Sequence, residues 1–128
     1  MLPIHDHTLN GYEVDAVAQT IVLHTVYPHS DPPLRTDVRF RDVRDHYFPF
    51  PRLPSILFEI EPAGSESVIR EHRSQINEGH RLIGWPSFYA GTVEAMVRGI
   101  EQTGHQFYVI GSSFGLDGWV LAKDVQSF

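Results

Sequence analysis

The histidines and carboxylates are the residues of this chain that could perform chemistry, and the densest group is His5, Asp6 and His7 near the start. Residues two apart on a β-strand share a face, so the two imidazoles could bind one metal ion together. A catalytic ion would need a third protein ligand and an open coordination position. This spacing is common in proteins. We therefore favour a terminus whose polar side chains cap the first strand, and we keep a metal site at these three residues as the alternative.

Two further groups of residues could supply a general acid and a general base. Asp42, Asp45 and His46 are close together in the sequence. Glu59 and Glu61 would share the solvent face of one strand. Such patterns are usually solvated charge, so we expect a non-enzymatic protein that needs no cofactor. A small ligand-binding protein or a metal-dependent enzyme that uses histidines and carboxylates remains the alternative.

Residues 111–115 match the G-x-S-x-G pattern of a nucleophile elbow. That motif requires a helix after the serine, but the run that follows at residues 119–122 is typical of a strand. The last histidine of the chain, His105, also precedes the serine, whereas in an α/β-hydrolase the histidine follows it. The pattern therefore indicates a turn rather than a nucleophile.

The same C-terminal stretch contains the strongest local signal in the sequence. Apolar runs at residues 107–110 and 119–122 flank a glycine-rich segment, which predicts two strands joined by a loop. The glycines allow positive φ, so the loop could turn sharply or approach another surface closely. Large apolar side chains in this loop indicate a contact site, for which the candidate residues are Phe114, Leu116, Asp117 and Trp119. A loop that folds back and buries Phe114 and Leu116 is the alternative.

Strand patterns dominate the first half of the chain. Residues 9–14 and 20–27 predict a hairpin, because the second segment is rich in β-branched and aromatic residues. Residues 37–41 and 55–61 alternate apolar and charged side chains, which predicts two more strands with one face in water. Between the last two strands, the proline-rich residues 46–54 favour an extended surface segment.

Two helices are predicted between the strands. The first would run from Ser65 as N-cap to Gly79 as stop, and the second over residues 88–103. Gly91 and Gly99 weaken the second helix by about 1 kcal/mol each relative to alanine, so we expect it to be held by packing close to the sheet. The order of strands, helices and strands predicts an α+β fold, a mostly antiparallel sheet of about five to six strands with two helices packed on one face.

Length and composition narrow the class of protein. A chain of 128 residues is expected to form a single domain, residues 1–128, with one sizeable core. The absence of cysteine excludes disulfides and zinc-thiolate sites. We find neither a signal-peptide pattern nor an apolar run of about 18 residues, so we expect a cytoplasmic protein and no membrane partner.

The charge of the chain bears on its partners. The formal net charge is -6, and the five arginines between residues 35 and 52 are interleaved with three aspartates. This balance opposes the electrostatic attraction that dominates nucleic-acid binding, so we expect no nucleic-acid partner. Negative charge would instead speed association with a protein that has a basic surface. The sequence leaves the oligomeric state open.

Two resemblances extend this interpretation. Residues 115–125, with Gly118-Trp119-Val120, resemble the last-strand pattern of bacterial SH3-like domains, although the two predicted helices do not belong to that small barrel. His5-Asp6 with Leu9, the strand at residues 38–43 and the ending at residues 112–119 are similar to small bacterial domains of unknown function. Some such domains are immunity proteins of toxin systems. The similarity implies a small acidic interaction domain, with an immunity-type inhibitor as one form of it.

Overall fold

Residues 2–128, which the computed structural model describes, form one antiparallel β-sheet of eight strands and three α-helices. The strands are β1 (Thr8–Asp15), β2 (Thr20–Tyr27), β3 (Leu34–Arg41), β4 (Asp45–Tyr47), β5 (Ser55–Ala63), β6 (Gln106–Phe114), β7 (Gly118–Ala122) and β8 (Asp124–Ser127). The helices are α1 (Ser65–Glu71), α2 (Arg73–Ile83) and α3 (Val93–Thr103). The strand order is β4-β7-β6-β5-β1-β2-β3-β8.

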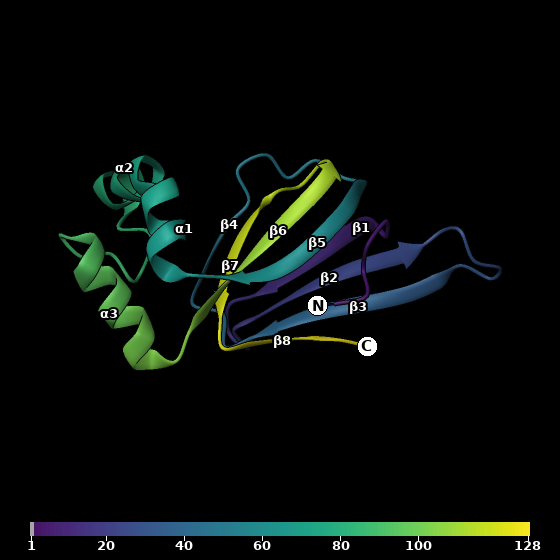
Figure 1. Cartoon of the computed structure of the whole chain (residues 1–128), viewed down its shortest axis with the longest axis horizontal. Coiled ribbons are helices and arrows are strands. Elements are labelled where there is room, and N and C mark those ends of the chain that lie inside the picture. The colour runs from purple at the N-terminus through teal and green to yellow at the C-terminus, as the bar shows by residue number, and fades with distance from the viewer. Residues whose placement is uncertain (1) are drawn as a thin grey trace.

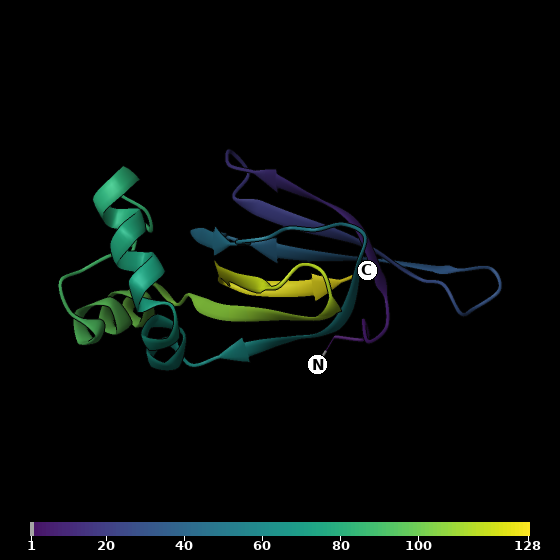
Figure 2. The same ribbon diagram turned by 90° about the horizontal axis from the view of Figure 1, so that it is seen from above.

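The sheet folds back on itself, so that two leaves face each other (Figures 1 and 2). One leaf contains β1, β2, β3 and β8, and the other contains β4, β5, β6 and β7. Only two residue pairs join β1 to β5, Thr8 with Ile56 and Leu9 with Ser55, so the leaves diverge from this short seam. Bends at residues 42–44 and at Lys123 also lead the chain from one leaf to the other. They place β4 and β8 at opposite margins of the sheet.

The space between the leaves holds the first hydrophobic core. Alternate residues of β2 and β3 point inward, Ile21 and Leu23 in β2 and Val38 and Phe40 in β3. Both leaves and the residues before β1 contribute to this core, whose other buried members are Ile4, Leu9, Leu57, Ile60, Ile110, Leu116, Val120 and Ala122.

The helices lie at one end of the molecule and form a second core with the outer face of β6 and β7 (Figure 1). In β7, Trp119 and Leu121 face the helices, whereas Val120 and Ala122 face the space between the leaves. This strand is therefore buried on both faces, which explains its uninterrupted apolar run. No helix among residues 2–128 has the length and apolar character needed to cross a lipid bilayer.

The α+β class and the antiparallel sheet are confirmed, but the predicted numbers of strands and helices are wrong. The sheet has eight strands rather than five to six because bends divide β3 from β4 and β7 from β8. There are three helices in residues 2–128 rather than two, because the chain leaves helical geometry at His72, where φ is -102° and ψ is 18°. A continuous helical period in the sequence does not reveal a break of a single residue.

The predicted end of the first helical segment is also wrong. Gly79 lies inside α2, and the helix ends at Gly84, which adopts a left-handed conformation with φ of 71°. A Cβ atom at Gly79 would collide with the indole of Trp85. The glycine therefore serves a close contact between α2 and the residue that follows its end.

The second predicted helix begins later than expected. α3 starts at Val93, and the Oγ1 of its N-cap residue, Thr92, accepts a hydrogen bond from the backbone nitrogen of Ala95 at 3.1 Å. Gly91 consequently precedes the helix. Gly99 lies within it, but no atom lies within 4 Å of the position that a Cβ would take there. Gly99 therefore makes no close approach to the sheet, although α3 packs against the sheet as predicted, through Val93, Met96 and Ile100.

Candidate functional site

The predicted contact loop is divided between the core and the surface. Leu116 and Trp119 are fully buried, at 0% exposure, in the inner core and in the helix-facing core respectively. Phe114 exposes 48% of its surface at the end of β6. Asp117 is exposed, and its Oδ1 accepts a hydrogen bond from the backbone nitrogen of Ser112 at 2.7 Å. Of the four predicted contact residues, only Phe114 and Asp117 can meet a partner directly.

A buried hydroxyl group determines which residues of the loop are buried and which are exposed. The Oγ of Ser55 in β5 accepts a hydrogen bond from the backbone nitrogen of Leu116 at 3.0 Å and donates one to the carbonyl of Phe114 at 2.8 Å. At Gly115, φ is 107° and a Cβ would lie 2.6 Å from the Cβ of Ser55. Only glycine tolerates both the backbone conformation and the short distance. The glycine therefore attaches the loop to β5, and Leu116 is drawn inward.

Phe114 belongs to an apolar patch on the outer face of β5 and β6. Its cross-strand partner is Ile56, so the two side chains point to the same side of the sheet. Phe58 follows on β5 after the inward-facing Leu57. Ile56 is 43% exposed and Phe58 is 48% exposed. We call Ile56, Phe58 and Phe114 the apolar patch.

The patch lies on a part of the sheet that the helices leave uncovered. The helices pack at the end of the sheet where β6 begins, whereas Phe114 is the last residue of β6 (Figure 1). Two polar side chains contact the rings of the patch, Arg52 over the ring of Phe114 and His5 against the ring of Phe58. The Arg52 guanidinium lies 4.7 Å from the centroid of the Phe114 ring, and the His5 ring meets the Phe58 ring edge-on at 5.3 Å.

Carboxylates lie beside the patch. Glu59 and Glu61 belong to the same strand as Ile56 and Phe58. The pKa of Glu59 is raised, first by desolvation of its carboxylate and next by the negative charge of the neighbouring Glu61. On the other side, the Oδ2 of Asp6 lies 3.2 Å from the Nδ1 of His5. The patch therefore has carboxylates on its own strand and at Asp6, and one guanidinium, that of Arg52, over the Phe114 ring.

His5, Asp6 and His7 do not present two imidazoles to one side. They form a turn before β1, with Asp6 at φ of 61°, so the strand alternation assumed for them does not apply. His5 is exposed, whereas His7 is buried with its ring 5.4 Å from that of Tyr27. Among residues 2–128, no three histidine, aspartate or glutamate side chains are grouped in a way that could hold a metal ion.

The first group of acid and base candidates serves a structural contact. Asp45 is buried, and its two carboxylate oxygens accept hydrogen bonds from the backbone nitrogen of Ser87 at 3.0 Å and its Oγ at 2.6 Å. Burial raises the pKa of Asp45, and the bonds from Ser87 oppose that shift. Burial lowers the pKa of the adjacent His46. Asp45 thus attaches the loop before α3 to β4, whereas Asp42 is exposed in the bend.

The strand predicted after the G-x-S-x-G pattern is confirmed. β7 returns antiparallel to β6, with pairs from Ile110 with Gly118 to Gln106 with Ala122. Ser113 is an exposed residue of this hairpin, so it does not stand on the strand-to-helix turn that a nucleophile elbow requires.

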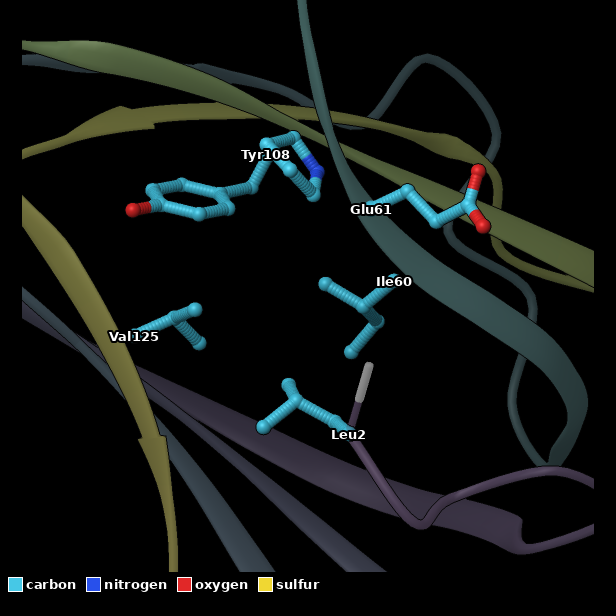
Figure 3. Close-up of a pocket in the computed structure, with 6 residues that line it drawn as sticks. Leu2, Ile60, Glu61, Tyr108 and Val125 are labelled. Atoms are coloured by element: carbon cyan, nitrogen blue, oxygen red, sulfur yellow. The ribbon is translucent and has the colours of Figure 1, made fainter.

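A cavity of about 480 Å³ opens between the two leaves (Figure 3). Its walls come from the residues before β1 and from β5, β6 and β8, and consist of Leu2, Ile60, Glu61, Pro62, Tyr108 and Val125. Sequence reasoning missed this cavity because most of its lining residues follow ordinary core patterns. Only the way the leaves diverge creates the space.

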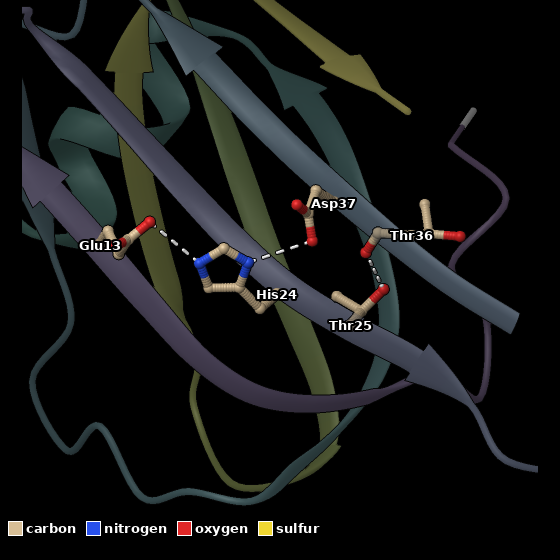
Figure 4. Close-up of polar contacts among 5 residues, drawn as sticks. All are labelled: Glu13, His24, Thr25, Thr36 and Asp37. Carbon is tan, nitrogen blue, oxygen red and sulfur yellow. Dashed lines mark hydrogen bonds and ion pairs between the residues drawn. The ribbon is translucent and has the colours of Figure 1, made fainter. Parts of the chain in front are cut away.

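On the outer face of the other leaf, His24 bridges two carboxylates across β1, β2 and β3 (Figure 4). Its Nδ1 lies 3.1 Å from the Oδ1 of Asp37, and its Nε2 lies 3.0 Å from the Oε2 of Glu13. The hydrogen bond to Asp37 is the largest cause of a raised pKa of His24; burial opposes the shift and Glu13 adds to it. The β2–β3 pairing places His24 opposite Asp37, a register that the sequence pattern did not predict.

The fold and these surfaces define a class, an α+β protein with an uncovered apolar patch on one leaf and a cavity between the leaves. Comparison with protein-family models, with curated proteins and with solved structures finds no match for the chain.

Proposed function

We propose that this protein is a non-enzymatic interaction domain that binds a partner protein through the apolar patch. The observation that carries the proposal is the exposed cross-strand pair of Ile56 and Phe114, with the exposed Phe58 two residues along β5, on a part of the sheet that the helices do not cover. Adjoining exposed apolar side chains mark interaction surfaces, because their contact with water is unfavourable. Aromatic side chains are frequent anchors of such interfaces.

The partner that fits this surface has basic groups around an apolar centre. Glu59 and Glu61 lie on the strand that carries the patch, and the whole chain has a net charge of -6. Complementary charge speeds association and makes its rate sensitive to salt. An immunity-type inhibitor, which the resemblance implied, is one protein of this kind: the patch would cover a basic surface of a toxin.

Site-specific photo-crosslinking tests the proposal and identifies the partner. A benzophenone amino acid placed at Phe114 is compared in living cells with the same residue at Val17, which is 96% exposed in the turn between β1 and β2. We expect a discrete crosslinked adduct from position 114 that position 17 does not give. Identical adducts from both positions, or none from position 114, would contradict a contact at the patch.

Metal analysis of untagged protein separates this function from the metal-dependent alternative. We expect less than about 0.1 equivalent of zinc, manganese or iron per chain, because a stable site needs three or more convergent ligands. A stoichiometric metal ion would instead favour the enzyme.

A further inference from the structure

The cavity between the leaves has a structural origin that is separate from the apolar patch. β7 pairs with β6 only as far as Ala122, and the bend at Lys123 then carries β8 to the edge of β3 in the other leaf. Beyond the bend, the described backbone does not bridge β8 to β5 or β6. Side chains and the segment before β1 border this margin, and they leave a space of about 480 Å³.

The lining of the cavity is largely uncharged. Leu2, Ile60 and Val125 point toward a common space from three segments, and the ring of Tyr108 forms another wall (Figure 3). The Tyr108 ring is supported from the core by the ring of Phe40, with centroids 5.8 Å apart. Among the lining residues that belong to residues 2–128, Glu61 is the one with a charged side chain, and its carboxylate is directed away from the centre of the space (Figure 3). The lining side chains from residues 2–128 therefore include no lysine, arginine or histidine.

We propose that this cavity binds a small uncharged molecule through an aromatic ring or a branched alkyl group. Its volume lies within the range of about 300–1,000 Å³ that is typical of ligand sites. Apolar cavities in proteins take up small apolar molecules because water gains few hydrogen bonds inside them. A charged ligand of either sign is disfavoured by the loss of its hydration among the apolar side chains of the lining.

The cavity and the patch occupy opposite faces of β5. Ile60 points into the space between the leaves, whereas Ile56 and Phe58 point outward. A ligand in the cavity would therefore leave the patch accessible, and substitutions in one site can serve as controls for the other.

Fluorescence titration with N-phenyl-1-naphthylamine tests the proposal. This probe is uncharged, and its emission rises in apolar surroundings. We expect saturable binding of one probe per chain to the wild-type protein. Val125→Trp, which fills the cavity, should weaken binding at least tenfold, whereas Phe114→Ser on the patch should leave the affinity within about twofold. Absence of saturable binding, or wild-type affinity in Val125→Trp, overturns the proposal, as does loss of binding in Phe114→Ser alone.

A second variant and a second measurement keep the test decisive if Val125→Trp does not fold. Pro62 is an exposed residue at the cavity wall, so Pro62→Trp should narrow the site with less effect on the core. Methyl NMR spectra of the wild-type protein with and without the probe should show shifts at Ile60 and Val125 and none at Ile56. Shifts at Ile56 without shifts at Ile60 would place the probe on the patch and overturn the proposal.

Discussion

Ser55 shows how one side chain decides which residues of the C-terminal hairpin reach solvent. Its hydroxyl is buried and bonded to the backbone of both Phe114 and Leu116. Ser55→Ala should lower the free energy of unfolding by about 1–3 kcal/mol, because it leaves a buried amide and a carbonyl without their partner. Urea unfolding measures the loss. The exposed Ser113→Ala is the matched control and should change stability by less than about 0.5 kcal/mol.

A small effect of Ser55→Ala would contradict the role given to the hydroxyl. In that case the hydrophobic burial of the Leu116 side chain would hold it inward. The position of the loop at Gly115 would then not require the hydrogen bonds to Ser55 of β5.

His24 makes stability depend on pH, because the folded protein holds its proton more tightly than the unfolded chain does. The pKa of His24 is raised above its ordinary value of 6.5, first by the hydrogen bond to Asp37. The resulting stabilisation is fully present below pH 6.5 and is lost as the pH rises through the higher pKa of the folded state. His24→Gln should therefore cost more stability at about pH 5.5 than at about pH 8.5.

The measurement is the difference in unfolding free energy between wild type and His24→Gln at the two pH values. Equal losses for His24→Gln at both pH values would show that the two carboxylates do not favour the protonated imidazole.

At the scale of single elements, the glycines of the helices give a paired prediction. Alanine is the better helix former by about 1 kcal/mol, so Gly99→Ala should raise the melting temperature, since nothing lies within 4 Å of the new Cβ. Gly79→Ala should lower it, because the new Cβ would collide with Trp85. Thermal unfolding of both variants checks the pair. A gain in stability for Gly79→Ala would contradict the close packing of Trp85 on α2.

Elements were predictable where the pattern of residues acts locally. The β1–β2 hairpin and the β6–β7 hairpin follow from alternation and turn residues, and both are confirmed by their pairing. The end of α2 was not predictable, because Gly79 and Gly84 are both plausible stops. Only the packing of Trp85 on the helix distinguishes them.

At the scale of the whole molecule, the two bends determine which leaf each strand joins, and the sequence pattern did not predict this. Strand periodicity does not reveal that residues 42–44 and Lys123 redirect the chain between leaves. The sequence therefore predicted Trp119 to be a contact residue beside the loop. In the structure Trp119 is buried between the sheet and the helices. Phe114 could be selected from its position in a turn, but Ile56 and Phe58 could not. Their exposure depends on which part of the sheet the helices cover.

The charge of the whole molecule also makes partner binding depend on the salt concentration. Because acidic groups lie around the apolar patch, the association rate with a basic partner should fall at least about fivefold between 50 mM and 500 mM salt. Stopped-flow kinetics with the purified partner, once crosslinking has identified it, measures this association rate at each salt concentration. A rate independent of salt would contradict charge complementarity and leave apolar contact alone as the basis of binding.

The most direct test of the apolar patch as the binding surface is calorimetric titration of the purified partner into wild-type protein, Phe114→Ser and Val17→Ser. Phe114 is about half exposed, so its replacement should keep the protein folded within about 1 kcal/mol of wild-type stability. We predict that Phe114→Ser weakens the affinity at least tenfold, as loss of an aromatic anchor does, and that Val17→Ser leaves it unchanged. Wild-type affinity in a folded Phe114→Ser variant would contradict the assignment of the patch as the site where this protein meets its partner.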